Sequence, residues 1–212
     1  MNILFVTSEC APFSKSGGLA DVAFSLPPAL KQAGDNIEII VPYYKMTRDR
    51  FEDEITFVKK CSCQLGERTI EYGLCRGELS GVTVWFIEHE HFFHRPRLYG
   101  YGDDSLRFAF FSRAVVSLLP SMGEMPEIVH CNDWQTGLAP FYLNKLYRES
   151  ADVYRNLKVV YTIHNLQYQG IFSPDIVENV LGLDWNDYAG GYIQFDNCVN
   201  YMKTGIMASL GS

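Results

Sequence analysis

The chain has 212 residues, of which 47% are hydrophobic and 20% charged, the balance of a soluble globular protein with a sizeable core. Its 18 Lys and Arg against 25 Asp and Glu give a net charge of −7, which argues against nucleic acid as a partner. No apolar run reaches the ~18 residues that a membrane helix needs, so we predict no membrane partner.

The first 42 residues predict a strand, a helix and a second strand. NILFVT (2–7) is an apolar run of strand length, and residues 18–33 carry apolar side chains at helical spacing. Pro27 and Pro28 lie inside this helix, and we expect them to kink it or split it in two. IEIIV (37–41) then reads as a buried strand. Such a unit requires a right-handed crossover and predicts a parallel sheet.

The middle of the chain has a different pattern. Residues 55–65, 68–79 and 81–90 alternate apolar and polar side chains between glycines, which predicts a β-meander whose last strand can rejoin the main sheet. Residues 105–122 predict a strongly apolar helix.

After this helix, the sequence again alternates predicted strands and helices, the pattern of a parallel sheet. The sequence predicts strands at 127–133 and 157–165 and helices at 134–150, 173–183 and 195–209. The whole chain therefore predicts one α/β domain, a Rossmann-like parallel sheet with flanking helices and an inserted β-meander.

The cysteines are scattered and form no C-x-x-C pair, so we predict reduced and mostly buried thiols. The N-terminus lacks the features of a secretory signal, which favours a cytoplasmic location, or a plastid only if a transit peptide has been removed. The six cysteines are Cys10, Cys61, Cys63, Cys75, Cys131 and Cys198.

Ligands of open parallel α/β sheets bind where the strands end. Four predicted strand exits are rich in polar and aromatic residues: TSECAPFSKSGGLAD, HEHFFHRPRLYGYGDD, HCNDWQTG and TIHNLQYQGIF. We expect these exits to converge at one edge of the sheet.

The first exit contains a lysine beside two glycines at the start of a helix. Gly17 and Gly18 can adopt positive φ and let backbone amides approach a ligand, and Lys15 supplies a charge suited to a phosphate. The stretch matches neither the dinucleotide nor the P-loop fingerprint. A tight strand–helix turn explains these glycines equally well.

The last two exits carry a histidine and a carboxylate. His164 is followed by Asn165, Gln167 and Tyr168, a set suited to reading sugar hydroxyls, although a strand-end histidine is also a common structural residue. Asp133 stands at a strand end before a helix, where a helix N-cap is the simpler interpretation.

The H-x-H-x-x-H run of His89, His91 and His94 has the residue type of a zinc site. No comparable fourth ligand is evident and the run joins a strand to a loop, so we predict no metal site.

Three stretches together resemble a known family: SECAPFSKSGGLADVAFSLPPAL, HCNDWQTGLAP and YTIHNLQYQGIF. They are similar to the N-terminal half of bacterial glycogen synthases and plant starch synthases, and the similarity covers nearly the whole chain. These enzymes are retaining glucosyltransferases that extend α-1,4-glucan from ADP-glucose. The resemblance implies the two-domain GT-B fold, in which two Rossmann-like halves face a cleft.

The resemblance also implies roles for individual residues on the donor side. Lys15 would contact the diphosphate of ADP-glucose, Gly17 and Gly18 would let the backbone approach the donor, and Asp21 would support their loop. His164 and Asp133 would lie beside the transferred glucose, with Asn165 nearby.

On the acceptor side, the resemblance places Glu9, Tyr99 and Tyr101 toward the glycogen or starch primer, where aromatic rings stack on sugar faces. It implies neither a metal nor a cofactor, ADP-glucose being the donor substrate.

Two departures from the family pattern bear on this interpretation. Asn132 stands where relatives often have the second histidine of a His-x-His-Asp-Trp motif, a change that we expect to be tolerated. The sequence also ends at Ser212, so residues 1–212 correspond to an N-terminal catalytic domain that is incomplete at its C-terminal end and lacks the second Rossmann-like domain. We therefore expect the isolated chain to be inactive.

Two other functions stay open. The chain could be a truncated, non-catalytic paralogue that binds glucan or a partner synthase, or it could belong to a sucrose-type or UDP-dependent transferase.

Overall fold

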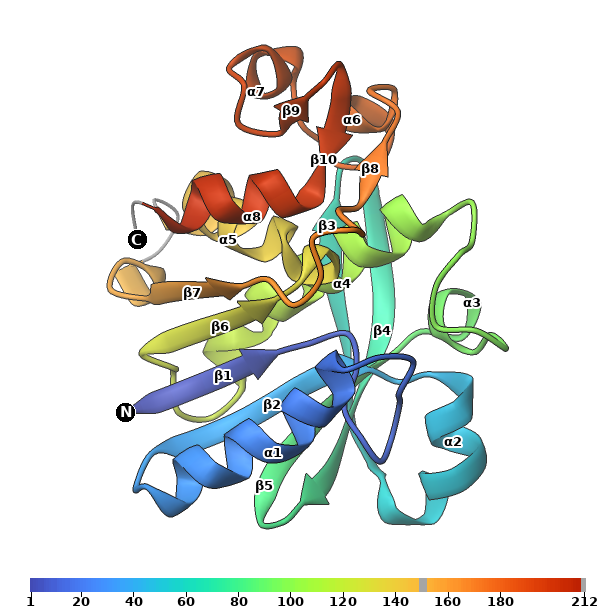
Figure 1. Ribbon diagram of the computed structural model, residues 1–212, viewed down its shortest axis with the longest axis vertical. Helices are drawn as coiled ribbons and strands as arrows, with labels where there is room; N and C mark the ends of the chain where they lie inside the picture. The colour runs from blue at the N-terminus through green and yellow to red at the C-terminus, as the bar shows by residue number, and fades with distance from the viewer. Residues whose placement is uncertain (149–151, 211–212) are drawn as a thin grey trace.

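A computed structural model describes residues 1–148 and 152–210 (Figure 1). Its main feature is one seven-stranded sheet in the order β3-β4-β5-β2-β1-β6-β7. The strands are β1 (Asn2–Val6), β2 (Asn36–Pro42), β3 (Thr56–Leu65), β4 (Arg68–Leu79), β5 (Val82–Glu88), β6 (Ile128–Asn132) and β7 (Lys158–Thr162).

The predicted strand–helix–strand unit at the start of the chain is confirmed. β1 and β2 pair in parallel, and α1 (Leu19–Gln32) connects them. The expected split of this helix was wrong, because α1 runs through Pro27 and Pro28 without interruption. Pro27 has no N–H to donate to the carbonyl of Ala23. That carbonyl instead lies 4.0 Å from the thiol of Cys10, which compensates in part for the missing helix bond.

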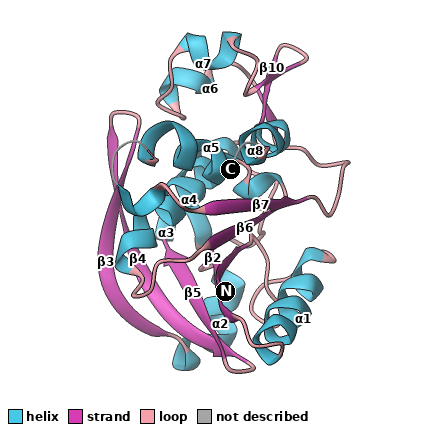
Figure 2. Ribbon diagram, turned by 90° about the vertical axis from the view of Figure 1, so that its left-hand side faces the viewer, coloured by secondary structure: helices cyan, strands magenta, loops and turns pink. Residues whose placement is uncertain are grey.

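The predicted β-meander is confirmed and enlarges the main sheet. β3 pairs antiparallel with β4, and β4 with β5, while β5 lies parallel to β2. Figure 2 shows the long strands β3 and β4 curving around the face that carries α4 (Asp104–Leu118). The sheet is therefore mixed, with its parallel part in the centre and at the β7 edge.

Two apolar cores lie on opposite faces of this sheet, because successive strand side chains point to opposite sides. Ile3 and Phe5 of β1 pack in the core on the α1 side. Leu4 and Val6 pack in the larger core, together with α4 and α5 (Leu138–Tyr142). Figure 2 shows α1 on one side of the sheet and α4 and α5 on the other.

The C-terminal third departs most from the predicted elements. The helix expected at 134–150 is a 3-10 turn (Trp134–Thr136), the short α5 and a π-helical turn (Leu143–Tyr147), and its predicted last residues, 149 and 150, lie outside the described part. The helix expected at 173–183 is confined to α6 (Ile176–Asn179).

The expected start of the last helix was also wrong. α8 covers Tyr201–Ser209, and the residues before it form a hairpin of β9 (Gln194–Phe195) and β10 (Cys198–Asn200). Asp196 and Asn197 take positive φ angles in this hairpin, a conformation that Asx residues tolerate. With β8 (Ile171–Phe172) the hairpin makes a small three-stranded sheet, visible at the top of Figure 1 near α7 (Trp185–Ala189).

All six cysteines are free and four of them are buried, as the sequence predicted. No helix in the described ranges is long and apolar enough to cross a membrane.

Candidate functional site at the strand exits

The predicted convergence of strand exits is confirmed, because hydrogen bonds join them directly. The Asp133 carboxylate after β6 accepts a bond of 2.7 Å from the backbone N–H of His164 after β7. The Asn132 amide at the end of β6 donates to the carbonyl of Val6 in β1 at 3.1 Å. Tyr99, in the loop that follows β5, donates to Glu9 after β1 at 2.9 Å. Figure 1 shows β1, β6 and β7 running in the same direction and ending on the same side of the sheet.

Glu9 organises the loop between β1 and α1. Its carboxylate accepts from the backbone N–H and the hydroxyl of Ser16, both at 2.6 Å, and from the N–H of Gly17 at 3.0 Å. The side chain is only 4% exposed, so these bonds replace water that the folded chain excludes. Hydrogen bonds to a carboxylate are among the stronger ones in proteins, and this set fixes the loop that carries Lys15.

Lys15 itself reaches into solvent beside Asp21, with Nζ 2.6 Å from the carboxylate and both side chains more than half exposed. An exposed pair of this kind adds little to stability and can rearrange around a ligand.

The fold does not require glycine at positions 17 and 18. Neither residue takes a positive φ, so that use of the glycines, expected from the sequence, is not realised. A Cβ atom added to Gly17 or Gly18 would meet nothing within 4 Å. Neither backbone strain nor crowding therefore explains these two glycines.

Asp133 has a strained backbone and a buried carboxylate. Its φ of 58° and ψ of 178° lie in a region that only glycine adopts readily. This conformation brings the carboxylate to the backbone N–H groups of His164 at 2.7 Å and Asn165 at 3.4 Å. Burial raises the pKa of the Asp133 carboxyl, the two amides oppose that shift, and the negative charge of Glu9 adds to it. Asp133 precedes a 3-10 turn but makes no side-chain cap bond, so the N-cap interpretation does not explain it.

The ring of His164 is held from the neighbouring strand. Its Nε2 lies 2.9 Å from Oδ1 of Asn132, which is fully buried. A second histidine, His130, lies two residues before Asn132 on β6 and pairs through Nε2 with the Thr162 hydroxyl at 2.8 Å. Burial, reinforced by His164, lowers the pKa of His130 to about 4, so this ring is neutral at physiological pH.

The comparisons with known proteins agree with this geometry. Residues 2–210 match the family model described as "Starch synthase catalytic domain". The chain belongs to this family. It is 42% identical to the glycogen synthase of Bacillus cereus over 209 residues, which cover 99% of the chain and 44% of that relative. It is 41% identical to the glycogen synthase of Geobacillus stearothermophilus, covering 43% of it.

A solved structure confirms the predicted fold class. The catalytic domain of starch synthase IV from Arabidopsis thaliana, bound to ADP and acarbose, superposes with a TM-score of 0.85 at 30% identity. The match covers 98% of this chain and 43% of the other. The chain thus spans less than half the length of the relatives that it matches.

The two tyrosines expected on the acceptor side of this starch synthase domain lie in different surroundings. The Tyr99 hydroxyl bonds to Glu9 and Ser8, each at 2.9 Å, so it belongs to the strand exits. The Tyr101 ring lies between guanidinium groups of Arg95, Arg97 and Arg107, 4.9 to 5.2 Å from its centroid. Its hydroxyl accepts from the backbone N–H of Arg97 at 2.9 Å, so it braces the loop.

The histidine run lies between β5 and α4. His89 accepts a bond of 3.3 Å from the N–H of Phe92 at the start of α3 (Glu90–Phe93) and stacks on its ring at 4.1 Å. Within residues 1–148 and 152–210, no group of three or more His, Cys, Asp or Glu side chains is arranged to hold a metal ion.

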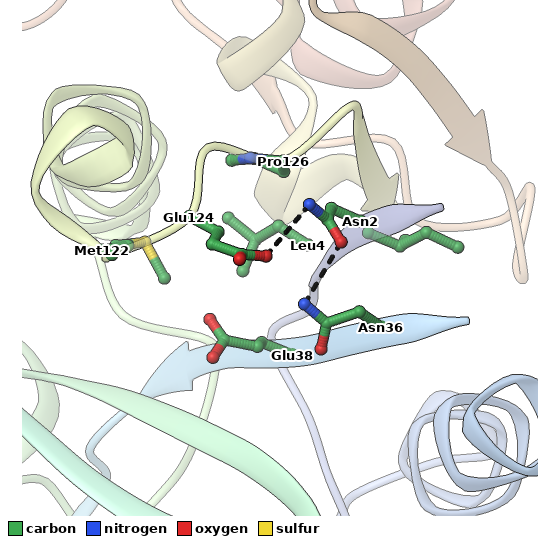
Figure 3. Close-up of a pocket in the computed structure, with 9 residues that line it drawn as sticks. Asn2, Leu4, Asn36, Glu38, Met122, Glu124 and Pro126 are labelled. Carbon is green, nitrogen blue, oxygen red and sulfur yellow. Dashed lines mark hydrogen bonds between the residues drawn. The ribbon is translucent and has the colours of Figure 1, made fainter. Parts of the chain in front are cut away.

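A pocket of about 260 Å³ lies near the amino ends of β1 and β2, away from the strand exits (Figure 3). Asn2 bonds there to Glu124 at 3.3 Å and to Asn36 at 3.2 Å, and Glu38 accepts from Trp85 at 2.8 Å. These polar groups satisfy one another, and none belongs to the predicted site.

Sequence reasoning missed two groups that shape the site. Asn132 was noticed only as a departure from the family pattern, although a polar residue at the end of a buried strand is itself a signal of a specific partner. Arg107, fully buried on α4, donates to Asp104 at 2.5 Å and to the carbonyl of Phe92 at 2.7 Å, and thereby ties α4 to α3. It lay inside an apolar helix pattern and gave no signal of its own.

Proposed function

We propose that this chain forms one side of the catalytic cleft of a retaining glucosyltransferase. The enzyme transfers glucose from ADP-glucose to the non-reducing end of an α-1,4-glucan, in glycogen or starch synthesis. The observation that carries the proposal is the bonded set of strand exits, in which Glu9 holds the Lys15–Gly18 loop and Asp133 holds the His164–Asn165 segment. Relatives named glycogen synthase, and a structural neighbour bound to ADP and acarbose, support it.

On the donor side, we assign the diphosphate to the loop that precedes α1. Lys15 supplies a positive charge, and the first turn of α1 offers unpaired N–H groups and the positive end of the helix dipole. Gly17 and Gly18 leave room for close approach, and Asp21 lies 2.6 Å from Lys15.

Beside the transferred glucose, His164, Asp133 and Asn165 orient the sugar. The Asp133 carboxylate fixes the two backbone amides, so the His164 ring and the Asn165 side chain start from defined positions. In a retaining transfer by front-face attack, the acceptor hydroxyl approaches the carbon that the diphosphate leaves. The protein then contributes orientation and stabilisation of the leaving group, without a nucleophile of its own.

For the acceptor, we propose the Glu9–Tyr99 pair and the adjoining loop that Tyr101 braces. The Tyr99 hydroxyl and the Glu9 carboxylate lie 2.9 Å apart at the border of the site, and the Tyr101 ring, held among Arg95, Arg97 and Arg107, keeps the adjoining loop in shape.

We further propose that residues 1–212 act as an N-terminal catalytic domain in the cytoplasm and that a second Rossmann-like domain supplies the rest of the nucleotide site. Each charge-assisted contact missing from that half would cost about 1.5–3 kcal/mol of binding, which is enough to leave the chain inactive by itself.

The test measures transfer of radioactive glucose from ADP-glucose to glycogen by two proteins. One is the chain alone. The other, the joined synthase, is residues 1–210 fused to the part of the Bacillus cereus glycogen synthase that the chain does not match. We expect transfer by the joined synthase and none by the chain alone. Efficient transfer by the chain alone would refute the need for a second half, and a folded but inactive fusion would refute the proposed reaction.

The alternative is a non-catalytic glucan-binding paralogue. Electrophoresis of the chain in gels containing glycogen separates the two. Retardation by glycogen, together with an inactive joined synthase, would favour the paralogue. UDP-glucose in place of ADP-glucose in the same transfer assay distinguishes a UDP-dependent enzyme.

A further inference from the structure

We propose that Asn132 is a positioning residue that fixes the tautomer of His164. The side-chain amide holds the proton of the neutral imidazole on Nε2 and thereby leaves the lone pair on Nδ1. The inference deepens the proposed function, on which the use of His164 toward a sugar rests, but the tautomer itself can be observed without any activity.

The orientation of the Asn132 amide follows from its two other contacts. Its nitrogen lies 3.1 Å from the carbonyl oxygen of Val6 and 3.1 Å from that of His130. Both partners are acceptors only, so the atom between them must be the NH₂ group, which can donate two bonds. The opposite assignment would place three oxygens together in a fully buried site. The oxygen of the amide therefore faces His164.

This orientation determines which ring nitrogen of His164 carries the proton. Nε2 lies 2.9 Å from Oδ1 of Asn132, an atom that can only accept. The neutral ring must donate through Nε2–H, and Nδ1 then has the lone pair. No hydrogen bond to Nδ1 is formed within the residues that the structure describes.

The neighbourhood keeps the amide from turning over. Asn132 is fully buried on β6, between β1 and β7, and its backbone carbonyl accepts a bond from the Thr136 hydroxyl at 2.9 Å. Two titratable groups interact with His164: Asp133 accepts a bond from the His164 N–H, and His130 has its own Nε2 paired with Thr162. Neither of these bonds competes for Nε2 of His164.

The chemical consequence is a hydrogen-bond acceptor of fixed position. Nδ1 of a half-buried ring at the strand exits can accept a bond from a hydroxyl group, the group that every sugar presents. A ring free to exchange tautomers would offer a donor there for part of the time and would bind the hydroxyl less selectively.

The experiment records long-range ¹H–¹⁵N spectra of the imidazole groups in the chain, which distinguish the two neutral tautomers. We compare the wild type with Asn132→Leu, which removes the acceptor, and with Asn132→His, which keeps an acceptor and a donor. Thr162→Val is the matched control, because it removes the partner of His130 and leaves that of His164. In the wild type we expect His164 as the Nε2–H tautomer alone, in Asn132→Leu a mixture, and in Asn132→His and Thr162→Val the wild-type signal.

A wild-type His164 that carries its proton on Nδ1, or a mixture unaffected by Asn132→Leu, would overturn the inference. If Asn132→Leu fails to fold, the wild-type spectrum and Asn132→His still decide it. In the joined synthase, we expect Asn132→Leu to lower kcat about 10-fold or more with a smaller change in KM, and Asn132→His to restore it. Full activity of a folded Asn132→Leu would show that the tautomer has no role in transfer, whereas an inactive wild-type fusion would refute the proposed function and leave the tautomer result standing.

Discussion

The exit of β1 and the joined exits of β6 and β7 contribute to the site in opposite ways. At the first, Lys15 is exposed, and Gly17 and Gly18 have open space above them. At the second, Asn132 and Asp133 are buried and bonded on several sides. The first exit presents an adaptable lysine on a loop held by Glu9, and the second is preorganised by buried bonds, which is the division expected of the diphosphate and sugar contacts that we propose.

The largest expected effect on the free energy of unfolding comes from replacing a glycine at the second exit. A Cβ atom on Gly137, just after the β6 exit, would lie 2.1 Å from the carbonyl oxygen of Tyr201. Because this oxygen belongs to the backbone, α8 would have to move, so Gly137→Ala should lower the free energy of unfolding by about 3 kcal/mol or more. Urea denaturation measures this loss, and a change below about 1 kcal/mol would show that the second exit is less rigid than described.

Acid should weaken the preorganised exit through His130. The pKa of His130 is lowered from 6.5 to about 4 in the folded chain. Between these two pH values, His130 is protonated in the unfolded chain and neutral in the folded chain. His130 therefore does not reduce the free energy of unfolding above pH ~6.5, and it reduces that free energy by about 2–3 kcal/mol as the pH falls toward ~4. The raised pKa of Asp133 acts in the opposite direction, because the folded chain takes up that proton more readily. Urea denaturation of His130→Gln and the wild type at several pH values isolates the histidine, and equal pH dependence of the two would contradict the assignment.

At the adaptable exit, Glu9 holds the segment that carries Lys15. Glu9→Gln would place an NH₂ group against donors that now share the carboxylate, so we expect stability to fall by about 1–2 kcal/mol. The amides of Ser16 and Gly17 should exchange hydrogen faster, because the carboxylate is their acceptor. Glu38→Gln is the matched control, since Glu38 accepts from Trp85 outside the site. Unchanged exchange at Ser16 and Gly17 would show that another group orders the loop.

The smallest effect on stability is expected at Gly17. Because a Cβ atom there meets nothing within 4 Å, Gly17→Ala should change the free energy of unfolding by less than about 0.5 kcal/mol. If a donor approaches this backbone, the same variant should lower transfer by the joined synthase about 10-fold, through loss of ~1.4 kcal/mol of contact. Wild-type activity would mean that no ligand comes close to Gly17.

The sequence predicted those parts of the fold that have a strong period. The strands and helices of the parallel sheet and the meander are regular apolar patterns, and their exits converge because parallel topology requires it. The region after Gly170 could not be predicted in the same way, since β8, β9 and β10 have two or three residues each and are set by tertiary contacts.

The same distinction holds within the site. Lys15, His164 and Asp133 could be singled out because their residue types and positions indicate a chemistry. Two sets of hydrogen bonds could not be predicted: the bond between Asn132 and His164, and the bonds from Ser16 and Gly17 to Glu9. They depend on where side chains point across strands and loops, which the spacing of residues along the chain does not indicate.

The central claim is that the strand exits form a sugar-nucleotide site, and two exposed lysines test it most directly. Lys15 pairs with Asp21 at 2.6 Å before the first turn of α1. Lys31, in the last turn of the same helix, contacts the carbonyl of Gly81 just before β5, at the opposite edge of the sheet. The measurement is kcat/KM for ADP-glucose in the joined synthase with Lys15→Met or Lys31→Met. We predict a loss of about 10- to 100-fold for Lys15→Met, the worth of one charge-assisted contact to a phosphate, and wild-type values for Lys31→Met. Equal values for the two variants would contradict the assignment of the donor to this edge of the sheet.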